Sequence, residues 1–251
     1  MHRVLAHNKS NQVPPGLCAL AVMTKAPRPG AVKTRLQPPL TPEQAASLNV
    51  CFLQDTAAAI MAACDSAAKR ALAVAVYTPT GAEQMYETIL PDEFRLLAQR
   101  GIEFGERLAN ALADLFTAGF TACCLIDSDS PTVTAETFSK AVHLLQNKNT
   151  GVVLGPSEDG GYYLIGMKKL VRRLFEQIDW STERVLEQTM TRAKEVGLHV
   201  HTLPTFFDVD DARSLSRLCD ELLVQNRIIA PATKTFLQQI TDRNGDRLFA
   251  K

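Results

Sequence analysis

Short apolar runs alternate with amphipathic stretches along most of the chain. The first run, residues 17–24 (LCALAVMT), is apolar throughout, as expected for a central parallel strand that is buried on both faces. Further strands are predicted at residues 71–77, 94–99, 121–126, 152–154, 162–166 and 199–203. Helices are predicted at residues 41–64, 82–89, 105–118, 134–145, 181–196, 212–225 and 232–240. The alternation predicts an α/β fold with a mostly parallel central sheet and helices on both faces.

Length and composition favour one large domain. The chain has 251 residues, of which 46% are hydrophobic, and this suits a single sizeable core. Residues 1–16 lack the apolar core of a signal peptide and end in Pro-Pro-Gly, so we expect a flexible leader. The domain is expected to span residues 17–241, followed by a charged tail at 242–251. No segment approaches the roughly 18 consecutive apolar residues of a spanning helix, so we expect a cytoplasmic protein without a membrane span.

The charge balance and the cysteines narrow the function classes. Lys plus Arg and Asp plus Glu number 27 each, so the formal net charge is zero. General nucleic-acid binders usually carry a basic excess, so we expect no nucleic-acid partner. The six cysteines sit in apolar runs without a CxxC spacing, which predicts buried, reduced thiols. Neither observation argues against a local basic site for a small anion.

The loop after the first strand is the strongest candidate site, because ligands bind at the carboxyl ends of strands in such sheets. Residues 25–35 hold four cations, Lys25, Arg28, Lys33 and Arg35, around Gly30. Lys and Arg side chains, with close backbone approach at a glycine, suit the phosphates of a nucleotide. The GxxxxGK[ST] spacing of a P-loop is absent. The alternative is a solvated basic loop without a ligand.

Acidic residues follow two later strands. Asp127 and Asp129 come directly after residues 121–126, and carboxylates at this spacing supply hard oxygen ligands for Mg²⁺ or Mn²⁺. The alternative is that Asp127 or Ser128 caps the turn. Residues 207–211 (FDVDD) could add a ligand if the fold brings them beside Asp129. Their local sequence by itself favours Asp210 or Asp211 as a helix cap.

Two further segments could contact a substrate. Residues 155–163 (GPSEDGGYY) combine paired glycines with Glu158 and Asp159, which could orient a sugar hydroxyl or act as a base. The Asp-Gly dipeptide is also typical of a hairpin turn, and both interpretations can hold together. Trp180, the single tryptophan, either packs before a helix cap or forms an aromatic wall for a base or sugar.

Six motifs together indicate a family. In order, TKAPRPGAVKTRL, QRGIEFGERLANAL, DSDSPTV, GPSEDGGYYLIGM, IDWST and FDVDDA resemble the bacterial CofC-like glycosyltransferase family, a branch of the GT-A nucleotide-diphospho-sugar transferase superfamily. The resemblance covers residues 17–218 and implies a GT-A, Rossmann-like fold, a nucleotide or nucleotide-sugar ligand and a divalent metal, Mg²⁺ or Mn²⁺. Family members usually read Gly-Ser-Asp-Cys-Pro where this chain reads DSDSP, so the resemblance supports Asp129 but not Asp127 as a metal ligand.

The resemblance also implies roles for individual residues. It assigns Lys25, Gly30, Lys33 and Arg35 to the phosphates, Gln99 and Gly105 to the base, Gly160, Gly161 and Tyr162 to the sugar side, and Asp129 and Asp210 to the metal. The assignment of Asp210 to the metal overrides the cap that its local sequence favours.

We therefore expect a metal-dependent glycosyltransferase with a nucleotide-sugar donor and a small-molecule acceptor. Lys33, Arg35 and the metal would stabilise the departing nucleoside diphosphate, while Glu158 or Asp159 would activate the acceptor. One alternative is a nucleotidyltransferase similar to phospholactate guanylyltransferase, which joins a nucleoside triphosphate to a phosphorylated small molecule and releases pyrophosphate. A second is a non-catalytic nucleotide-binding module. The base, sugar, acceptor and oligomeric state stay open, with a homodimer as the common default.

Overall fold

The computed structural model describes residues 1–67 and 70–244 and is built on one eight-stranded sheet. The sheet order is β1-β4-β3-β2-β5-β7-β6-β8. The strands are β1 (Arg3–Val4), β2 (Cys18–Lys25), β3 (Ala71–Thr78), β4 (Arg95–Ala98), β5 (Ala122–Ile126), β6 (Val152–Pro156), β7 (Tyr162–Met167) and β8 (Val200–Thr202). Only β7 runs antiparallel to its neighbours among the described strands. The predicted mostly parallel sheet is therefore confirmed.

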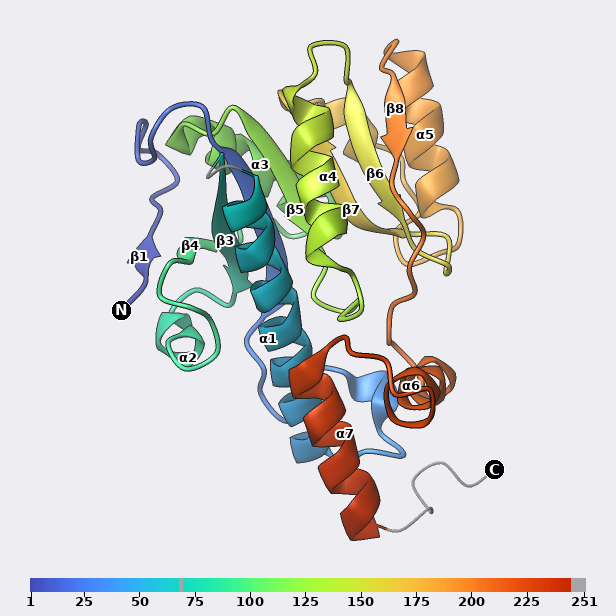
Figure 1. The fold of residues 1–251 in the computed structure, drawn as a ribbon. Helices are drawn as coiled ribbons and strands as arrows, with labels where there is room; N and C mark the ends of the chain where they lie inside the picture. The colour runs from blue at the N-terminus through green and yellow to red at the C-terminus, as the bar shows by residue number, and fades with distance from the viewer. Residues whose placement is uncertain (68–69, 245–251) are drawn as a thin grey trace.

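Helices cover both faces of the sheet, as Figure 1 shows. One face packs against α1 (Pro42–Ser66) and α4 (Ala135–Gln146), and the other against α3 (Phe104–Ala118) and α5 (Val185–Glu195). Along β2, Leu20 and Val22 join the first core, whereas Ala19 and Ala21 join the second. Successive strand residues point to opposite faces, so burial on both faces requires the unbroken apolar run seen in the sequence.

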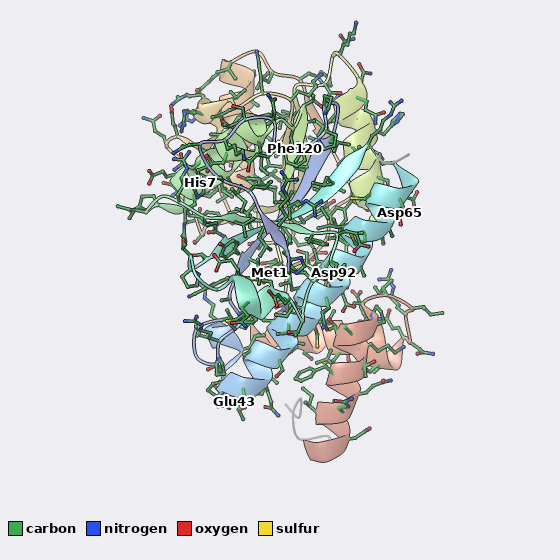
Figure 2. The ribbon with its side chains drawn as sticks, turned by 90° about the vertical axis from the view of Figure 1, so that its left-hand side faces the viewer. Met1, His7, Glu43, Asp65, Asp92 and Phe120 are labelled. Carbon is green, nitrogen blue, oxygen red and sulfur yellow. The ribbon has the colours of Figure 1, made fainter. Side chains whose placement is uncertain are left out.

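The long helix α1 is a core helix. Thr41 caps it by accepting a hydrogen bond from the backbone of Gln44, and Pro42 occupies its first turn. Among the described helices, α1 is the one long and apolar enough to cross a membrane, yet 56% of its apolar window is buried. Figure 2 shows Glu43 and Asp65 near its two ends. Its apolar face packs against β2, β3 and α4, which accounts for its composition.

A third core joins the carboxyl-terminal helices to the start of α1. It contains α6 (Ala212–Cys219), the π-helical segment η3 (Asp220–Val224), α7 (Pro231–Asn244) and the short helix η1 (Thr34–Leu36). Figure 1 shows α7 lying beside α1. This packing brings the loop before α6 next to the basic loop after β2, although the two loops are 177 residues apart.

A buried carboxylate of α1 fastens α7. The two oxygens of Asp55 accept hydrogen bonds from the backbone nitrogens of Ala232 (2.9 Å) and Thr233 (2.8 Å), in the first turn of α7. Those nitrogens have no partner within the helix, so the carboxylate satisfies donors that would otherwise be buried without one.

Replacing Asp55 by alanine should therefore destabilise the protein. We expect the free energy of unfolding to fall by about 2 kcal/mol, because two buried donors lose their acceptor. Asp65→Ala is the matched control, since Asp65 lies on the same helix with an exposed side chain. Urea unfolding of both variants measures the difference, and equal midpoints would contradict the role given to Asp55.

The amino-terminal segment departs from the expectation of a flexible leader. β1 pairs in parallel with β4, and Leu5 is only 2% exposed in the core on the α3 face. Gln12 folds the following turn by exchanging hydrogen bonds with the backbone of Ala6. Polar residues separate the few apolar residues of this segment, so the sequence pattern did not predict this short edge strand. At the other end, residues 242–244 complete α7, and the rest of the expected tail lies outside the described residues.

One helix boundary near the candidate site differs from the expectation, at the segment after Trp180. The expected helix from Ser181 begins only at Val185, because Ser181 has a φ of 64° and cannot continue into a helix. Thr182 instead donates a hydrogen bond to the carbonyl of Asp179 at 2.7 Å. The four residues before α5 thus form a bent loop at the edge of the functional cleft.

Candidate functional site

The expected site residues gather around two adjoining hollows at the carboxyl ends of β2 and β5. The smaller hollow has a volume of about 260 Å³ and is walled by the basic loop, and the larger has about 520 Å³ and extends toward α3 and α5. Both hollows are lined by Arg35, Ser128, Asp129 and Asp210. The shared lining makes them two parts of one cleft.

Lys33 is the centre of the cleft. Its Nζ lies 2.7 Å from an oxygen of Asp129, 2.8 Å from an oxygen of Asp210 and 2.8 Å from the carbonyl oxygen of Val209. The lysine side chain is 5% exposed, whereas those of Asp129 and Asp210 are 35% and 47% exposed. The backbone nitrogen of Val209 also donates to the carbonyl of Asp129 at 3.0 Å. One buried ammonium thus joins loops from three separate parts of the chain.

The charges around Lys33 shift several pKa values. Burial would lower the pKa of Lys33, but the charges of Asp129 and Asp210 outweigh burial and raise it above its ordinary value. Burial and the charge of Asp129 raise the pKa of Asp127 well above its usual range. Burial also raises the pKa of Asp208, and the charges of Asp159 and Asp210 add to the shift. The cleft therefore holds a fixed cation beside carboxyl groups that bind protons readily.

The basic loop supplies three of its four cations to the smaller hollow. Lys25, Lys33 and Arg35 line it, whereas Arg28 and Gly30 are exposed outside the lining. The φ of 73° at Gly30 is the left-handed conformation that favours glycine in the turn of the loop. The structure therefore brings together Lys25, Lys33 and Arg35 as expected, but not Gly30.

Asn49 also lines the smaller hollow and was missed by sequence reasoning. It lies on α1 and its residue is 6% exposed. The available signal was its place on the buried face of the helix, among apolar neighbours such as Ala45 and Leu53. A polar side chain at this buried position is explained if the amide group of Asn49 forms hydrogen bonds with a polar ligand in the hollow.

The donor atoms of Asp129 and Asp210 suit a divalent metal. One oxygen of each carboxylate lies within 2.8 Å of the Lys33 ammonium, so the two are close together, and Mg²⁺ typically binds one or two protein carboxylates while phosphates and water complete its shell. Among residues 1–67 and 70–244, no group of three or more His, Cys, Asp or Glu side chains is arranged to hold a metal by itself. A metal here would thus need water or ligand phosphates to complete its shell and would share the carboxylates with Lys33.

The larger hollow has an aromatic wall. Trp180 meets Phe104 edge to face, with ring centroids 5.2 Å apart, and both line the hollow with Tyr162. A Cβ at Gly105 would lie 2.6 Å from Nε1 of Trp180. Gly105, expected at the base, therefore makes room for the indole at the start of α3. Asp159 and Gly161 also line this hollow, and an oxygen of Asp159 accepts the Gly161 backbone N–H at 2.8 Å.

Glu158, expected as a catalytic carboxylate, is turned away from the cleft. Its oxygens are 2.5 and 3.0 Å from the guanidinium of Arg217, and the side chain is 48% exposed. That hydrogen bond lowers the pKa of Glu158. Arg217 lies 59 residues further along the chain, so the local sequence gave no sign of this pairing.

Two further expected ligand contacts are structural. The amide of Gln99, expected at the base, donates to the carbonyl oxygens of Thr24 (3.2 Å) and Val76 (2.8 Å), and so ties the end of β4 to β2 and β3. Gly160, expected at the sugar, has a φ of 88°, and a Cβ there would collide with the carbonyl of Glu183. Close packing against the loop before α5, rather than a substrate, thus requires glycine at residue 160.

Glu158→Gln should consequently leave the activity nearly unchanged. We expect kcat within about twofold of the wild type, since exposed ion pairs contribute little and Glu158 does not line the cleft. The matched comparison is Asp159→Asn, one residue away and inside the cleft, where a larger loss is expected. A tenfold loss in the glutamine variant would return Glu158 to the candidate bases.

Comparisons with known proteins place the fold. A family model described as "Uncharacterized protein conserved in bacteria (DUF2064)" matches residues 58–182. None of the curated proteins matches the chain. A solved structure from Desulfovibrio desulfuricans G20, provisionally described as a nucleotide-diphospho-sugar transferase, is 29% identical with a TM-score of 0.80. The alignment covers 94% of this chain and 97% of that one.

More distant structures share the fold. CMP:2-keto-3-deoxy-manno-octonic acid synthetase, solved with CTP, is 11% identical with a TM-score of 0.54, over 84% of this chain and 100% of that one. A nucleotidyl transferase from Methanothermobacter thermautotroptrophicus is 15% identical with a TM-score of 0.53. The alignment covers 83% of this chain and 99% of that one. The expected Rossmann-like fold of nucleotide-dependent transferases is confirmed, and the Desulfovibrio structure supports the expected assignment to transferase enzymes.

Proposed function

We propose that the chain is a metal-dependent glycosyltransferase that uses a nucleotide-sugar donor and a small-molecule acceptor. The convergence of Lys33, Asp129 and Asp210 beside the two cations Lys25 and Arg35 carries this proposal. It creates a phosphate-sized hollow that combines cations for the phosphates with carboxylates for a metal. The likeness to the Desulfovibrio structure, over almost the full length of both chains, supports the same class of reaction.

On the nucleotide side, the chain would hold the diphosphate by charge. Lys25 and Arg35, both exposed at the mouth of the smaller hollow, are free to turn toward phosphate oxygens. Lys33 is fixed by its two carboxylates and would present its charge without further ordering. When bound at Asp129 and Asp210, a divalent metal would neutralise charge that develops on the leaving diphosphate.

On the acceptor side, the larger hollow offers carboxylates other than Glu158. Asp159 and Asp208 both line it, and burial raises the pKa of Asp208, which suits a group that accepts a proton from a hydroxyl. The hydroxyl of Ser157 donates to Asp208 at 3.0 Å and fixes the orientation of that carboxylate. Asp208, not expected as a catalytic residue from the sequence, therefore joins Asp159 as a candidate base.

Nucleotidyl transfer is the alternative chemistry, because the same fold serves both reactions. A triphosphate carries more negative charge than a sugar diphosphate and calls for more cations. The smaller hollow receives three cations rather than four, and one of them, Lys33, is already paired with two carboxylates. The small number of cations that are available for phosphate groups favours a diphosphate-containing donor over a triphosphate. A cytoplasmic location and a homodimer are also part of the proposal.

A ligand screen tests the proposed donor. Thermal unfolding is followed with sugar nucleotides and nucleoside triphosphates, each with Mg²⁺, Mn²⁺ or EDTA. A ligand at about 100 times its dissociation constant stabilises a fold by about 2.7 kcal/mol, so binding is readily seen. We expect a sugar nucleotide with metal to give the largest shift, and that shift to disappear with EDTA. A screen without any nucleotide-dependent shift would contradict a nucleotide site.

A further inference from the structure

The larger hollow is lined by two chemically different groups of side chains. One group is apolar, with Phe104, Tyr162 and Trp180 as its aromatic wall together with Leu108 and Ile165. The other group consists of carboxyl side chains, among them Asp129. At about 520 Å³ the hollow is larger than a sugar ring alone requires. It therefore has room for a second substrate with a body of its own.

The aromatic wall is held in place before any ligand binds. Trp180 packs edge to face on Phe104, and the absence of a side chain at Gly105 lets the indole lie against the start of α3. Phe104 remains 45% exposed, and its neighbour Ile102 is 88% exposed just outside the hollow. An apolar surface that stays partly exposed at the mouth of a cleft gains most when an apolar group covers it.

The charge of the larger hollow is strongly one-sided. Six carboxyl side chains line it, namely Asp127, Asp129, Asp159, Glu183, Asp208 and Asp210, against one cation, Arg35, although burial raises the pKa of Asp127 and so favours its uncharged form. Lys33 neutralises part of the charge of Asp129 and Asp210 from the smaller hollow. Among the described residues that line the hollow Arg35 is the one cation, and the guanidinium of Arg107 lies 5.8 Å from the Phe104 ring centroid without lining the hollow. A phosphate group there would face carboxylates of its own sign.

We propose that this hollow binds the acceptor, and that the acceptor is an uncharged hydroxyl compound with an aromatic or alkyl body rather than a phosphorylated molecule. The apolar body would cover Phe104 and Trp180, and the hydroxyl group would face Asp159 and Asp208. The assignment of the acceptor rests on the proposed glycosyl transfer. An uncharged acceptor also distinguishes glycosyl transfer from nucleotidyl transfer, because the second substrate of nucleotidyl transfer would carry a phosphate group into the larger hollow.

The tryptophan itself can report binding, because Trp180 is the only one in the sequence. Phenyl β-D-glucoside, glucose and phenyl phosphate are titrated into the protein in EDTA, while tryptophan emission is recorded. EDTA prevents a metal from bridging phosphate to the carboxylates. We expect phenyl glucoside to bind at least about tenfold more tightly than either glucose or phenyl phosphate. Phenyl phosphate binding as tightly as phenyl glucoside would overturn the proposal.

A matched pair of variants locates the site. Phe104→Ala should weaken phenyl glucoside binding at least about fivefold, whereas Ile102→Ala should leave it unchanged, since Ile102 does not line the hollow. Both side chains are exposed enough for the fold to persist, and thermal unfolding checks that it does. Equal effects of the two variants would contradict the aromatic wall as the binding surface.

Quenchers test the charge without any substrate. With each quenching constant divided by that of free N-acetyltryptophanamide, caesium should quench Trp180 more strongly than iodide in the wild type, and Glu183→Gln should reduce this preference. Preferential quenching by iodide would overturn the acidic character of the hollow. Because the fluorescence measurements contain no nucleotide, they can contradict the acceptor proposal even when the ligand screen supports the nucleotide site. A screen without nucleotide binding would instead refute the donor site and leave the fluorescence result standing.

Discussion

Asp129→Ala is expected to lower kcat by about 10²–10³-fold, a loss typical of removing one main source of transition-state charge stabilisation. The carboxylate has two roles in the cleft: it holds Lys33 at 2.7 Å and is one of the two proposed metal ligands. Transfer to a neutral acceptor at saturating Mn²⁺ measures the loss. The metal concentration for half-maximal activity should rise as well, because one carboxylate ligand is gone.

The control for this variant is Asp92→Ala, which removes an exposed carboxylate outside the cleft. Asp129 is itself 35% exposed, so the fold should tolerate its loss and thermal unfolding should show a native transition. A folded Asp129→Ala protein with a rate within threefold of the wild type would refute the assigned site.

Lys33→Met is expected to reduce kcat by about 100-fold and to lower the free energy of unfolding by about 1–2 kcal/mol. The variant keeps a side chain of similar length but leaves Asp129 and Asp210 facing each other without their shared cation. The stability loss is modest because both carboxylates are partly exposed and water screens their repulsion. The control is Lys140→Met, on the exposed side of α4, where neither quantity should change.

The same variant makes a second prediction about the metal. Because Lys33 holds both carboxylates, added Mn²⁺ competes with its ammonium in the wild type. Without nucleotide, Mn²⁺ should therefore raise the unfolding temperature of Lys33→Met more than that of the wild type. An equal rise in both proteins would mean that the metal does not bind at Asp129 and Asp210.

The sheet and its helices could be predicted because local pattern and burial agree. An unbroken apolar run of this length, such as 17–24, is typical of a strand that is covered on both faces, and β2 is such a strand. Thr41 and Pro42 marked the start of α1 through ordinary capping chemistry. The short strand β1 was not predicted, because two residues at a sheet edge are too few to show a periodic pattern.

The site was predictable only in part, because its geometry depends on long-range packing. Local sequence favoured a helix cap at Asp210 or Asp211, and only the third core brings Asp210 to Lys33. Asp211 is the residue that caps α6. Glu158 resembled a catalytic residue until its partner Arg217 was located on α6. Residue type and loop position thus identified the cleft, but not which carboxylate faces it.

Analysis of the products by ³¹P NMR tests the central claim most directly. The sugar nucleotide selected by the ligand screen is incubated with protein, Mg²⁺ and a neutral aromatic alcohol, and its parent triphosphate is incubated with protein, Mg²⁺ and a phosphorylated small molecule. The account predicts release of nucleoside diphosphate from the sugar nucleotide, dependent on metal and on Asp129, with no pyrophosphate from the triphosphate. Pyrophosphate release, or diphosphate release that persists in Asp129→Ala with EDTA, would contradict it.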